Sequence, residues 1–436
     1  AGAGCPPAAW RMKRDAFWSA LEAGIAGTLS LVTSFLVAHL VGPQALGIGA
    51  AATAVNVVLW VAVNALFADA LVQRAELGPR EAASAFWASG LVGVAAALVQ
   101  VATGWLLAWA LDDARLLPMA VALALPLPLV GGAGVIQGLL TRERAYMRLA
   151  LRTIIGQGLG CAVGIAAALA GAGAWSVVLQ QAIGTSIGAL VLLLGRRWRP
   201  DLVFDIPALR GLLAVGLPLT GSTLVLIGRY RLFAVLIGAY AGSAVLGEVH
   251  IAFRLVDTLR DLTFTALWRL MLPALSPHQG DKRAMLALVD RWMRLACLSL
   301  LPLCAGLVFG LTHVVSQIMG PAWQSAGQAA LPLVALMAIS VLTFPGGVAL
   351  VASGGVRIAL FGNIAALVLT CGGVVLLPPA DAWKAVMIWT VSQLVVLPYT
   401  LWVNARALGV GVLRPLRGII PGGTAGPAPE ASLVQS

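Results

Sequence analysis

Long uninterrupted apolar stretches constrain this chain more than any other feature of its sequence. Only 45 of its 436 residues carry a formal charge, 28 Lys or Arg and 17 Asp or Glu, whereas 60% are hydrophobic. A soluble domain carries about 25% charged residues, so this chain cannot cover a water-facing surface. Its apolar residues occur in runs of about 20 or more, which suits helices that cross a bilayer and not the alternating strands of an outer-membrane barrel. The sequence therefore predicts an all-α polytopic membrane protein and excludes a soluble fold.

Twelve stretches are long enough to cross the roughly 30 Å hydrocarbon layer as helices. They lie near residues 17–40, 44–73, 82–110, 115–140, 146–170, 173–195, 208–238, 242–273, 286–311, 326–351, 357–377 and 382–405. The proline and glycine residues of the fourth stretch, Pro126 and Pro128 among them, predict an interruption of its helical hydrogen bonding.

The longest charged linker divides these stretches into two sets of six. The predicted organisation is an N-terminal extension (1–16), a first lobe of helices one to six (17–195), a cytoplasmic linker (196–207), a second lobe of helices seven to twelve (208–405) and a cytoplasmic tail (406–436). We expect the first eleven residues to be disordered. We expect the same of the tail, because it is rich in Gly, Pro and Ala without a periodic apolar face.

The positive charges fall on one side of the predicted membrane. One set of alternate loops holds 21 Lys or Arg residues, whereas the other holds two, Arg115 and Lys384. Loops rich in Lys and Arg stay in the cytoplasm. The distribution predicts an even number of helices with both termini in the cytoplasm. It also places the net charge of +11 in loops, so we expect no nucleic-acid partner.

The two predicted lobes share a short motif. Residues 42–47 read GPQALG and residues 242–247 read GSAVLG, both at the turn from the first to the second helix of a lobe. A repeat at equivalent turns is expected of parallel repeats related by an axis along the membrane normal, an arrangement that encloses a central cavity. This architecture is typical of transporters.

Ionisable residues inside the seventh and eighth stretches form the strongest chemical signal. An ionisable residue at membrane depth is costly unless it faces a cavity or a partner. The residues in question are Arg229, Arg231, His250, Arg254, Asp257, Arg260, Asp261 and Arg269. His250, Arg254, Asp257 and Asp261 follow i, i+4, i+7 and i+11 spacing, which places them along one helix face.

Two interpretations of these residues stay open. In the first, the arginines form a cationic cavity wall that binds an anionic head group, because guanidinium pairs with phosphate and carboxylate in bidentate fashion. We assign this role to Arg229, Arg231, Arg254 and Arg260. In the second, Arg254 pairs with Asp257, and Arg260 pairs with Asp257 or Asp261, within one helix. These charges then neutralise one another, and Arg269 extends to the inner membrane interface.

Other polar residues lie in the first two stretches. Glu22, Asn56, Asn64 and Asp69 are candidates for ion coupling or for polar cavity contacts, as are His250, Asp257 and Asp261. A membrane carboxylate can bind H⁺ or Na⁺ during a transport cycle. The sequence holds no phosphate-binding loop, no HExxH motif and no GxSxG motif, so we expect a transporter and not an enzyme. Apart from a coupling H⁺ or Na⁺, we expect no cofactor and no metal.

Several segments resemble one known family. They are VGPQALG (41–47), IQGLLTRERAYMRLALR (136–152), GAGAWSVVLQQ (171–181), GLPLTGS (216–222), LGEVHIAFRL (246–255), MLPALS (271–276) and MGPAWQSAGQAALPLVALM (319–337). In their order and spacing they resemble the polysaccharide transporter family, the Wzx-type flippases of lipid-linked oligosaccharides. This family is part of the MOP superfamily, which also contains MATE and MurJ-like proteins.

The resemblance implies a twelve-helix, two-lobed fold that moves an undecaprenyl-diphosphate-linked oligosaccharide across the inner membrane by alternating access. Lipopolysaccharide or exopolysaccharide assembly would be the process served, and a polysaccharide polymerase and chain-length proteins would be partners. Two alternatives stay open: a MATE-type ion-coupled antiporter of small molecules and a membrane enzyme of polysaccharide assembly. Five arginines in a cavity would repel cationic drugs, which disfavours the antiporter.

Overall fold

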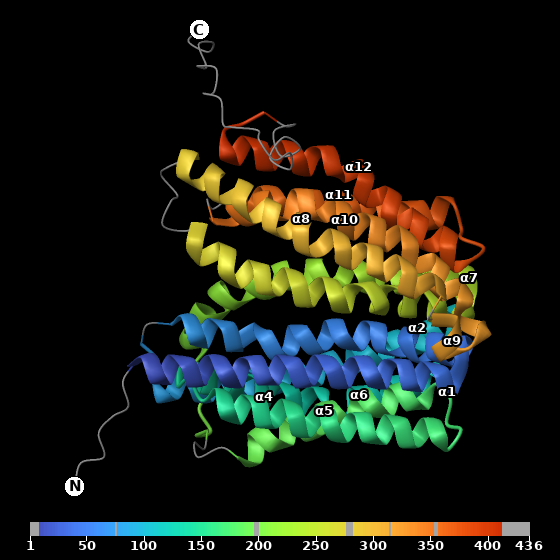
Figure 1. Cartoon of the computed structure of the whole chain (residues 1–436). Helices are drawn as coiled ribbons and strands as arrows, with labels where there is room; N and C mark the ends of the chain where they lie inside the picture. Colours follow the sequence, from blue (N-terminus) through green and yellow to red (C-terminus); the bar gives the residue numbers. More distant parts are fainter. Residues whose placement is uncertain are drawn as a thin grey trace. The chain divides into compact units, whose positions relative to one another are not determined.

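The computed structural model describes residues 8–74, 76–195, 200–275, 282–313, 315–352 and 356–411, and within these ranges the chain is helical without any strand (Figure 1). The helices are α1 (Ala8–Gln73), α2 (Pro79–Ala110), α3 (Leu116–Ala124), α4 (Leu127–Arg142), α5 (Tyr146–Leu169), α6 (Trp175–Leu194), α7 (Ile206–Leu275), α8 (Lys282–His313), α9 (Val315–Met319), the 3₁₀ helix η2 (Pro321–Trp323), α10 (Gln324–Ala352), α11 (Val356–Leu376) and α12 (Ala382–Leu408). The prediction of an all-α polytopic chain is confirmed.

Ten helical segments of the described residues are long and apolar enough to cross a membrane, and a shorter apolar helix spans Phe361–Leu376. The first of the ten covers 57 residues, Phe17–Gln73, which at about 1.5 Å per residue is more than twice the thickness of the hydrocarbon layer. Two of the twelve predicted stretches are thus joined in α1, and two more are joined in α7. The tail beyond residue 411 lies outside the described residues.

The start of α1 differs from the prediction. Helix α1 begins at Ala8, so residues 8–11 are helical, and the expected disorder through Arg11 is wrong for them. Residues 1–7 lie outside the described part of the chain.

Each long helix is bent at the first glycine of the repeated motif. Gly42 has φ 76° and ψ 171°, and Gly242 has φ 87° and ψ 169°. A positive φ strains any residue with a Cβ, so glycine is the residue that allows this bend. The matching angles at positions 200 residues apart show that the two motifs fold alike, which supports the predicted repeat.

The two motifs also pack against each other through their last glycines. A Cβ built on Gly47 would lie 1.7 Å from the carbonyl oxygen of Ser243, and one built on Gly247 would lie 2.0 Å from that of Pro43. Positions 43 and 47 of one motif thus contact positions 243 and 247 of the other in a reciprocal way. The contact is between backbones, and neither glycine has room for a side chain.

The fourth predicted stretch is divided into α3 and α4, as its prolines predict. Helix α3 ends at Ala124 and α4 begins at Leu127, with Pro126 as its N-cap. The carbonyl oxygen of Leu123 near this break accepts a hydrogen bond of 3.0 Å from Asn56 Nδ2, and Asn56 is buried. Polar side chains that satisfy backbone groups at a break are what a proline in a membrane helix requires.

The turn between α2 and α3 is closed by an ion pair. Arg115 donates from Nε and Nη2 to the two carboxylate oxygens of Asp113, at 2.9 and 2.8 Å. This bidentate hydrogen bond stabilises the ionised carboxylate, so the Arg115 guanidinium lowers the pKa of Asp113 below its usual value.

Residue contacts divide the chain into two units, residues 1–251 with 377–382 and residues 252–376 with 383–436. In the first unit α5 packs on α6 and α1, and α4 packs on α1 and α2 (Figure 1). Its core includes Phe67, Leu71 and Leu212. The predicted lobe boundaries at residues 195 and 208 stay a prediction.

The core of the second unit joins the end of α7 to α8, α10 and α12. Its buried members include Met271, Val289, Val348 and Leu408. Phe264 stacks on Phe344 with ring centroids 4.5 Å apart. Helix α10 packs along α8, so these helices form a bundle of their own.

We expect Gly47→Ala to destabilise the protein by about 1–3 kcal/mol, the usual cost of overpacking a close contact. The change in the free energy of unfolding is to be measured on purified protein in detergent. Gly24→Ala is the matched control, because Gly24 lies on the same helix and a Cβ there meets nothing within 4 Å. If both variants are equally stable, the backbone contact between the motifs is not present.

Candidate functional site

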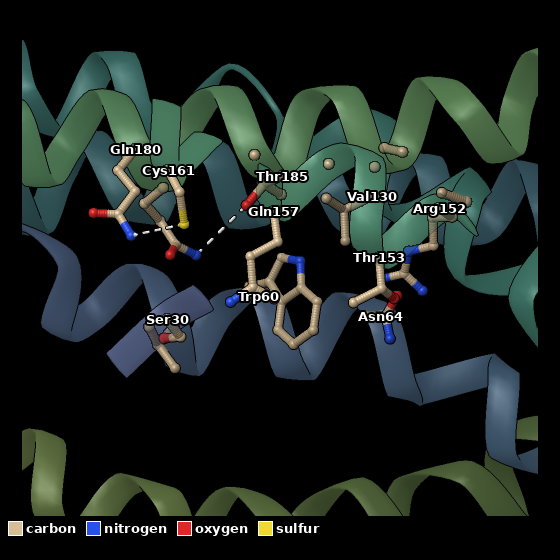
Figure 2. A pocket seen from close by; sticks show the side chains of 17 residues that line it. Ser30, Trp60, Asn64, Val130, Arg152, Thr153, Gln157, Cys161, Gln180 and Thr185 are labelled. Carbon is tan, nitrogen blue, oxygen red and sulfur yellow. Dashed lines mark hydrogen bonds between the residues drawn. The ribbon is translucent and has the colours of Figure 1, made fainter. Parts of the chain in front are cut away.

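A polar cavity of about 360 Å³ lies inside the first unit, between α1, α4, α5 and α6 (Figure 2). Its polar side chains are mainly amides and hydroxyls, a combination that is unusual within apolar helices. The polar lining residues are Ser30, Asn64, Arg152, Thr153, Gln157, Gln180, Gln181 and Thr185. Trp60 contributes a large apolar surface to the same cavity.

Glycines bring α5 and α6 together along one side of the cavity. A Cβ on Gly156 would lie 2.8 Å from the carbonyl oxygen of Gly184, and a Cβ on Gly160 would lie 2.6 Å from that of Gln180. Small residues allow membrane helices to approach closely. The long polar side chains next to these glycines, such as Gln157 and Gln181, therefore line the cavity and do not separate the helices.

Charged residues gather at one end of the cavity. Thr153 Oγ1 donates a hydrogen bond of 2.5 Å to Glu22 Oε1, which connects α5 to α1. The neighbouring Arg152 donates from Nη1 to Gln137 Oε1 at 2.5 Å and is attracted by the charge of Glu22. Both Glu22 and Arg152 are half-buried. Charged side chains inside a membrane need such partners. This cluster therefore allows one acidic and one basic side chain to lie between the helices.

Three glutamine side chains line the remaining part of the cavity. Gln157 donates from Nε2 to the carbonyl oxygen of Ala26 on α1 at 2.9 Å. Gln180 donates to Cys161 Sγ at 3.7 Å, and Gln181 lies 3.5 Å from Thr185 Oγ1, as the dashed lines in Figure 2 show. These contacts hold the side chains in place around the cavity.

The structure separates the four polar candidates of the first two predicted stretches. Asn64 lines the cavity, and Glu22 bonds a residue that lines it. Asn56 bonds the backbone at the break between α3 and α4, which gives it a structural role. Asp69 is exposed and does not line the cavity.

Two of the basic candidates in the first unit, Arg231 and His250, contact a tyrosine on α7. Arg231 lies over the ring of Tyr230, with its guanidinium carbon 5.4 Å from the ring centroid. The hydroxyl of Tyr230 lies 3.4 Å from His250 Nδ1, across the bend at Gly242. Arg229 is half-buried on the same helix. The structure thus associates Arg231 and His250 through an aromatic residue that the sequence analysis did not select.

The candidates after residue 251 belong to the second unit. Arg260 Nη1 bonds Asp257 Oδ1 at 2.8 Å, a pair at i, i+3 spacing. For this pair the neutralising interpretation describes what the structure shows. Arg254 is half-buried, and the side chain of Asp261 lies outside the described residues.

Nothing in the described part of the chain resembles a metal centre, since no group of three or more His, Cys, Asp or Glu residues is close enough to hold an ion. Amide and hydroxyl oxygens in the cavity are nevertheless the ligand types that hard cations accept.

The sequence analysis missed most of the cavity. It did not select Arg152, Thr153, Gln157, Gln180 or Gln181. The signal is present, because polar residues recur at positions 153 and 157 of an otherwise apolar stretch, one helical turn apart. Their partners on α1 lie about 130 residues earlier in the chain, and only the fold brings them together.

Comparisons with known proteins place this geometry in context. A family model described as "Polysaccharide biosynthesis protein" matches residues 36–328. The succinoglycan biosynthesis transport protein ExoT of Rhizobium meliloti (strain 1021) is 24% identical over 331 residues, which are 75% of this chain and 65% of that protein. The chain thus spans less than two thirds of the length of this relative.

Solved structures show the same fold at low identity. Lipid II flippase MurJ, in an inward closed conformation, matches with a TM-score of 0.72 and 11% identity over 92% of this chain and 90% of that one. A MOP superfamily transporter from Pyrococcus furiosus matches with a TM-score of 0.57 and 16% identity over 92% and 96%. An outward-facing MATE family transporter matches with 0.57 and 15% over 91% and 96%. These likenesses confirm the predicted MOP superfamily fold.

We expect Glu22→Gln and Thr153→Val to be non-additive by about 1 kcal/mol in a double-mutant cycle, within the range measured for hydrogen bonds between membrane helices. The free energy of unfolding of the purified protein is the quantity to measure. Thr103→Val, combined with Glu22→Gln, is the matched control and should be additive. The Thr103 hydroxyl bonds only carbonyl oxygens of its own helix. Additive effects of Glu22→Gln and Thr153→Val would contradict the contact.

Proposed function

The chain belongs to the polysaccharide biosynthesis protein family, and from this membership we propose that it is a flippase that moves a lipid-diphosphate-linked oligosaccharide across a bacterial inner membrane. The similarity to a succinoglycan biosynthesis transport protein supports a polysaccharide precursor as the substrate, and the fold shared with a lipid II flippase supports a lipid-linked one. An undecaprenyl diphosphate carries the oligosaccharide in this proposal.

The observation that carries the transport mechanism is the reciprocal contact between Gly47 and Gly247. Two repeats that bend at equivalent glycines and meet through equivalent backbone atoms are suited to rock against each other. In the proposed cycle, this rocking exposes a central cavity to each side of the membrane in turn.

Basic residues of α7 are proposed to bind the diphosphate. Helix α7 between residues 229 and 269 contains five arginines against three acidic residues, a net charge of 5 − 3 = +2. We assign the anion-binding role to Arg229, Arg231, Arg254 and Arg260, the last of which also pairs with Asp257. Guanidinium groups bind phosphate oxygens in bidentate fashion, which suits a diphosphate.

Glu22 is the proposed ion-coupling residue. Its carboxylate can bind H⁺ or Na⁺, and its charge attracts the guanidinium of Arg152. A cation at Glu22 therefore competes with the guanidinium of Arg152. This competition would link ion binding to a rearrangement of α1 and α5, the two helices that the Glu22–Thr153 hydrogen bond joins.

In a deletion strain of the source bacterium we expect lipid-linked single repeat units to accumulate on the cytoplasmic side and exported polymer to be lost. The restored gene should reverse both effects, whereas the Arg229→Ala/Arg231→Ala variant should restore about tenfold less export or worse, because a hydrogen bond to a charged group contributes about 1.5–3 kcal/mol. Arg210→Ala, an exposed arginine at the start of α7, is the control and should complement.

The same assay tests Glu22→Gln, which keeps the shape of the side chain but cannot be ionised. This variant should fail to restore export at normal protein level.

Full complementation by the double arginine variant would refute the substrate site. Normal glycans in the deletion strain would refute the flippase and favour the small-molecule antiporter. Repeat units already flipped but unpolymerised would point to the assembly enzyme.

The proposed orientation places both termini in the cytoplasm. In a variant without native cysteines, we expect Ala114→Cys to react with a membrane-impermeant maleimide added outside intact inner-membrane spheroplasts. Leu202→Cys should react only after permeabilisation. Both positions are exposed. The opposite pattern of labelling would invert the proposed topology.

A further inference from the structure

A second cavity of the first unit, of about 690 Å³, lies where α4 ends, α5 begins and α6 ends. Three arginines line it, Arg14, Arg144 and Arg148, together with one acidic residue, Glu143. The formal charge of its lining is therefore 3 − 1 = +2. We refer to this cavity, which is separate from the polar cavity around Gln157, as the arginine crevice.

The rest of the arginine crevice is apolar. Its inner wall is formed by the buried side chains of Ile136, Leu140 and Leu192. Its outer part is formed by Leu151 and Ile155 of α5, which are 41% and 40% exposed. The crevice thus combines a cationic end with an apolar groove.

The outer part belongs to a longer apolar stripe on α5. Met147, Leu151, Ile155 and Leu159 recur every four residues and are each 40–48% exposed. An exposed apolar stripe on a membrane-spanning helix is a surface for lipid chains. The arginine crevice therefore opens onto the face of α5 that contacts the hydrocarbon layer.

Two of the arginines are available for a ligand. Arg144 and Arg148 are exposed, and neither forms an ion pair within the described ranges of the chain. Ala145, which lines the crevice, is the N-cap of α5, and this helix start has no side-chain cap and no acidic residue in its first turn. The positive end of the helix dipole adds to the charge of the arginines.

We propose that the arginine crevice binds an anionic phospholipid of the surrounding bilayer, with the phosphate on Arg144 and Arg148 and an acyl chain along Leu151 and Ile155. Basic pockets between membrane helices at the cytoplasmic side suit anionic head groups. From Arg148 to Ile155 the helix rises by about 10 Å, so the apolar residues lie at the depth of the chain segments that follow the glycerol. A soluble anion would leave this groove unused.

The proposed lipid site does not rest on the proposed transport function. It uses no residue of α7 and none of the residues around Glu22. A protein that flips no lipid-linked sugar would still bind the phospholipid, so the two proposals can fail separately.

The test is native mass spectrometry of the full chain released from nanodiscs of phosphatidylcholine that contain phosphatidylglycerol with the same acyl chains. The wild-type protein should retain phosphatidylglycerol in preference to phosphatidylcholine. The Arg144→Gln/Arg148→Gln variant should bind it about 25-fold more weakly, about fivefold for each arginine. Arg80→Gln, an exposed arginine at the start of α2 outside the crevice, is the matched control and should bind normally.

A second variant, Leu151→Trp, fills the groove without changing charge and should also lower retention. It keeps the test decisive if the arginine variant does not fold. Equal retention by the wild-type protein and both crevice variants would overturn the proposal. Competition by inorganic phosphate or glycerol phosphate as strong as that by the lipid would also overturn it, because the crevice would then be a site for a soluble anion.

Discussion

Backbone groups inside the hydrocarbon layer must find their hydrogen-bond partners within the chain, and the rest of this structure depends on that requirement. Helices satisfy it, and they are interrupted at few places. The bends of α1 and α7 occur at glycines with positive φ, and the break between α3 and α4 is bridged by Asn56, which donates to the carbonyl oxygen of Leu123. Asn56, a polar candidate of the sequence analysis, thus forms a hydrogen bond with the backbone.

The same requirement applies to side chains and explains the polar cavity of the first unit. Thr153 donates to Glu22, and Arg152 donates to Gln137. The three glutamines bond a backbone carbonyl, the sulfur of Cys161 and the hydroxyl of Thr185. Charge of both signs can therefore be held between helices that close glycine contacts keep together.

Much of the fold could be predicted from local features. The length of the apolar stretches predicts the helices, and the prolines predict the break after α3. The repeated motif predicts the positions of the two bends, at Gly42 and Gly242. The i, i+3 spacing of Asp257 and Arg260 also predicts their ion pair. The cavity could not be predicted in this way, because the partners of Glu22 and Gln157 are set by tertiary packing. The hydrogen bond from Asn56 to the Leu123 carbonyl oxygen could not be predicted for the same reason.

The crossing of the two repeats at Gly47 and Gly247 has a consequence for how such proteins diversify. It is made of backbone atoms, so it imposes no particular side-chain chemistry on the walls of the molecule. Mutations that adapt the walls to a new cargo leave the crossing untouched, provided that both glycines are kept. The side-chain chemistry of the walls can therefore vary while the connection between the repeats stays the same, and only two glycines are needed to keep it.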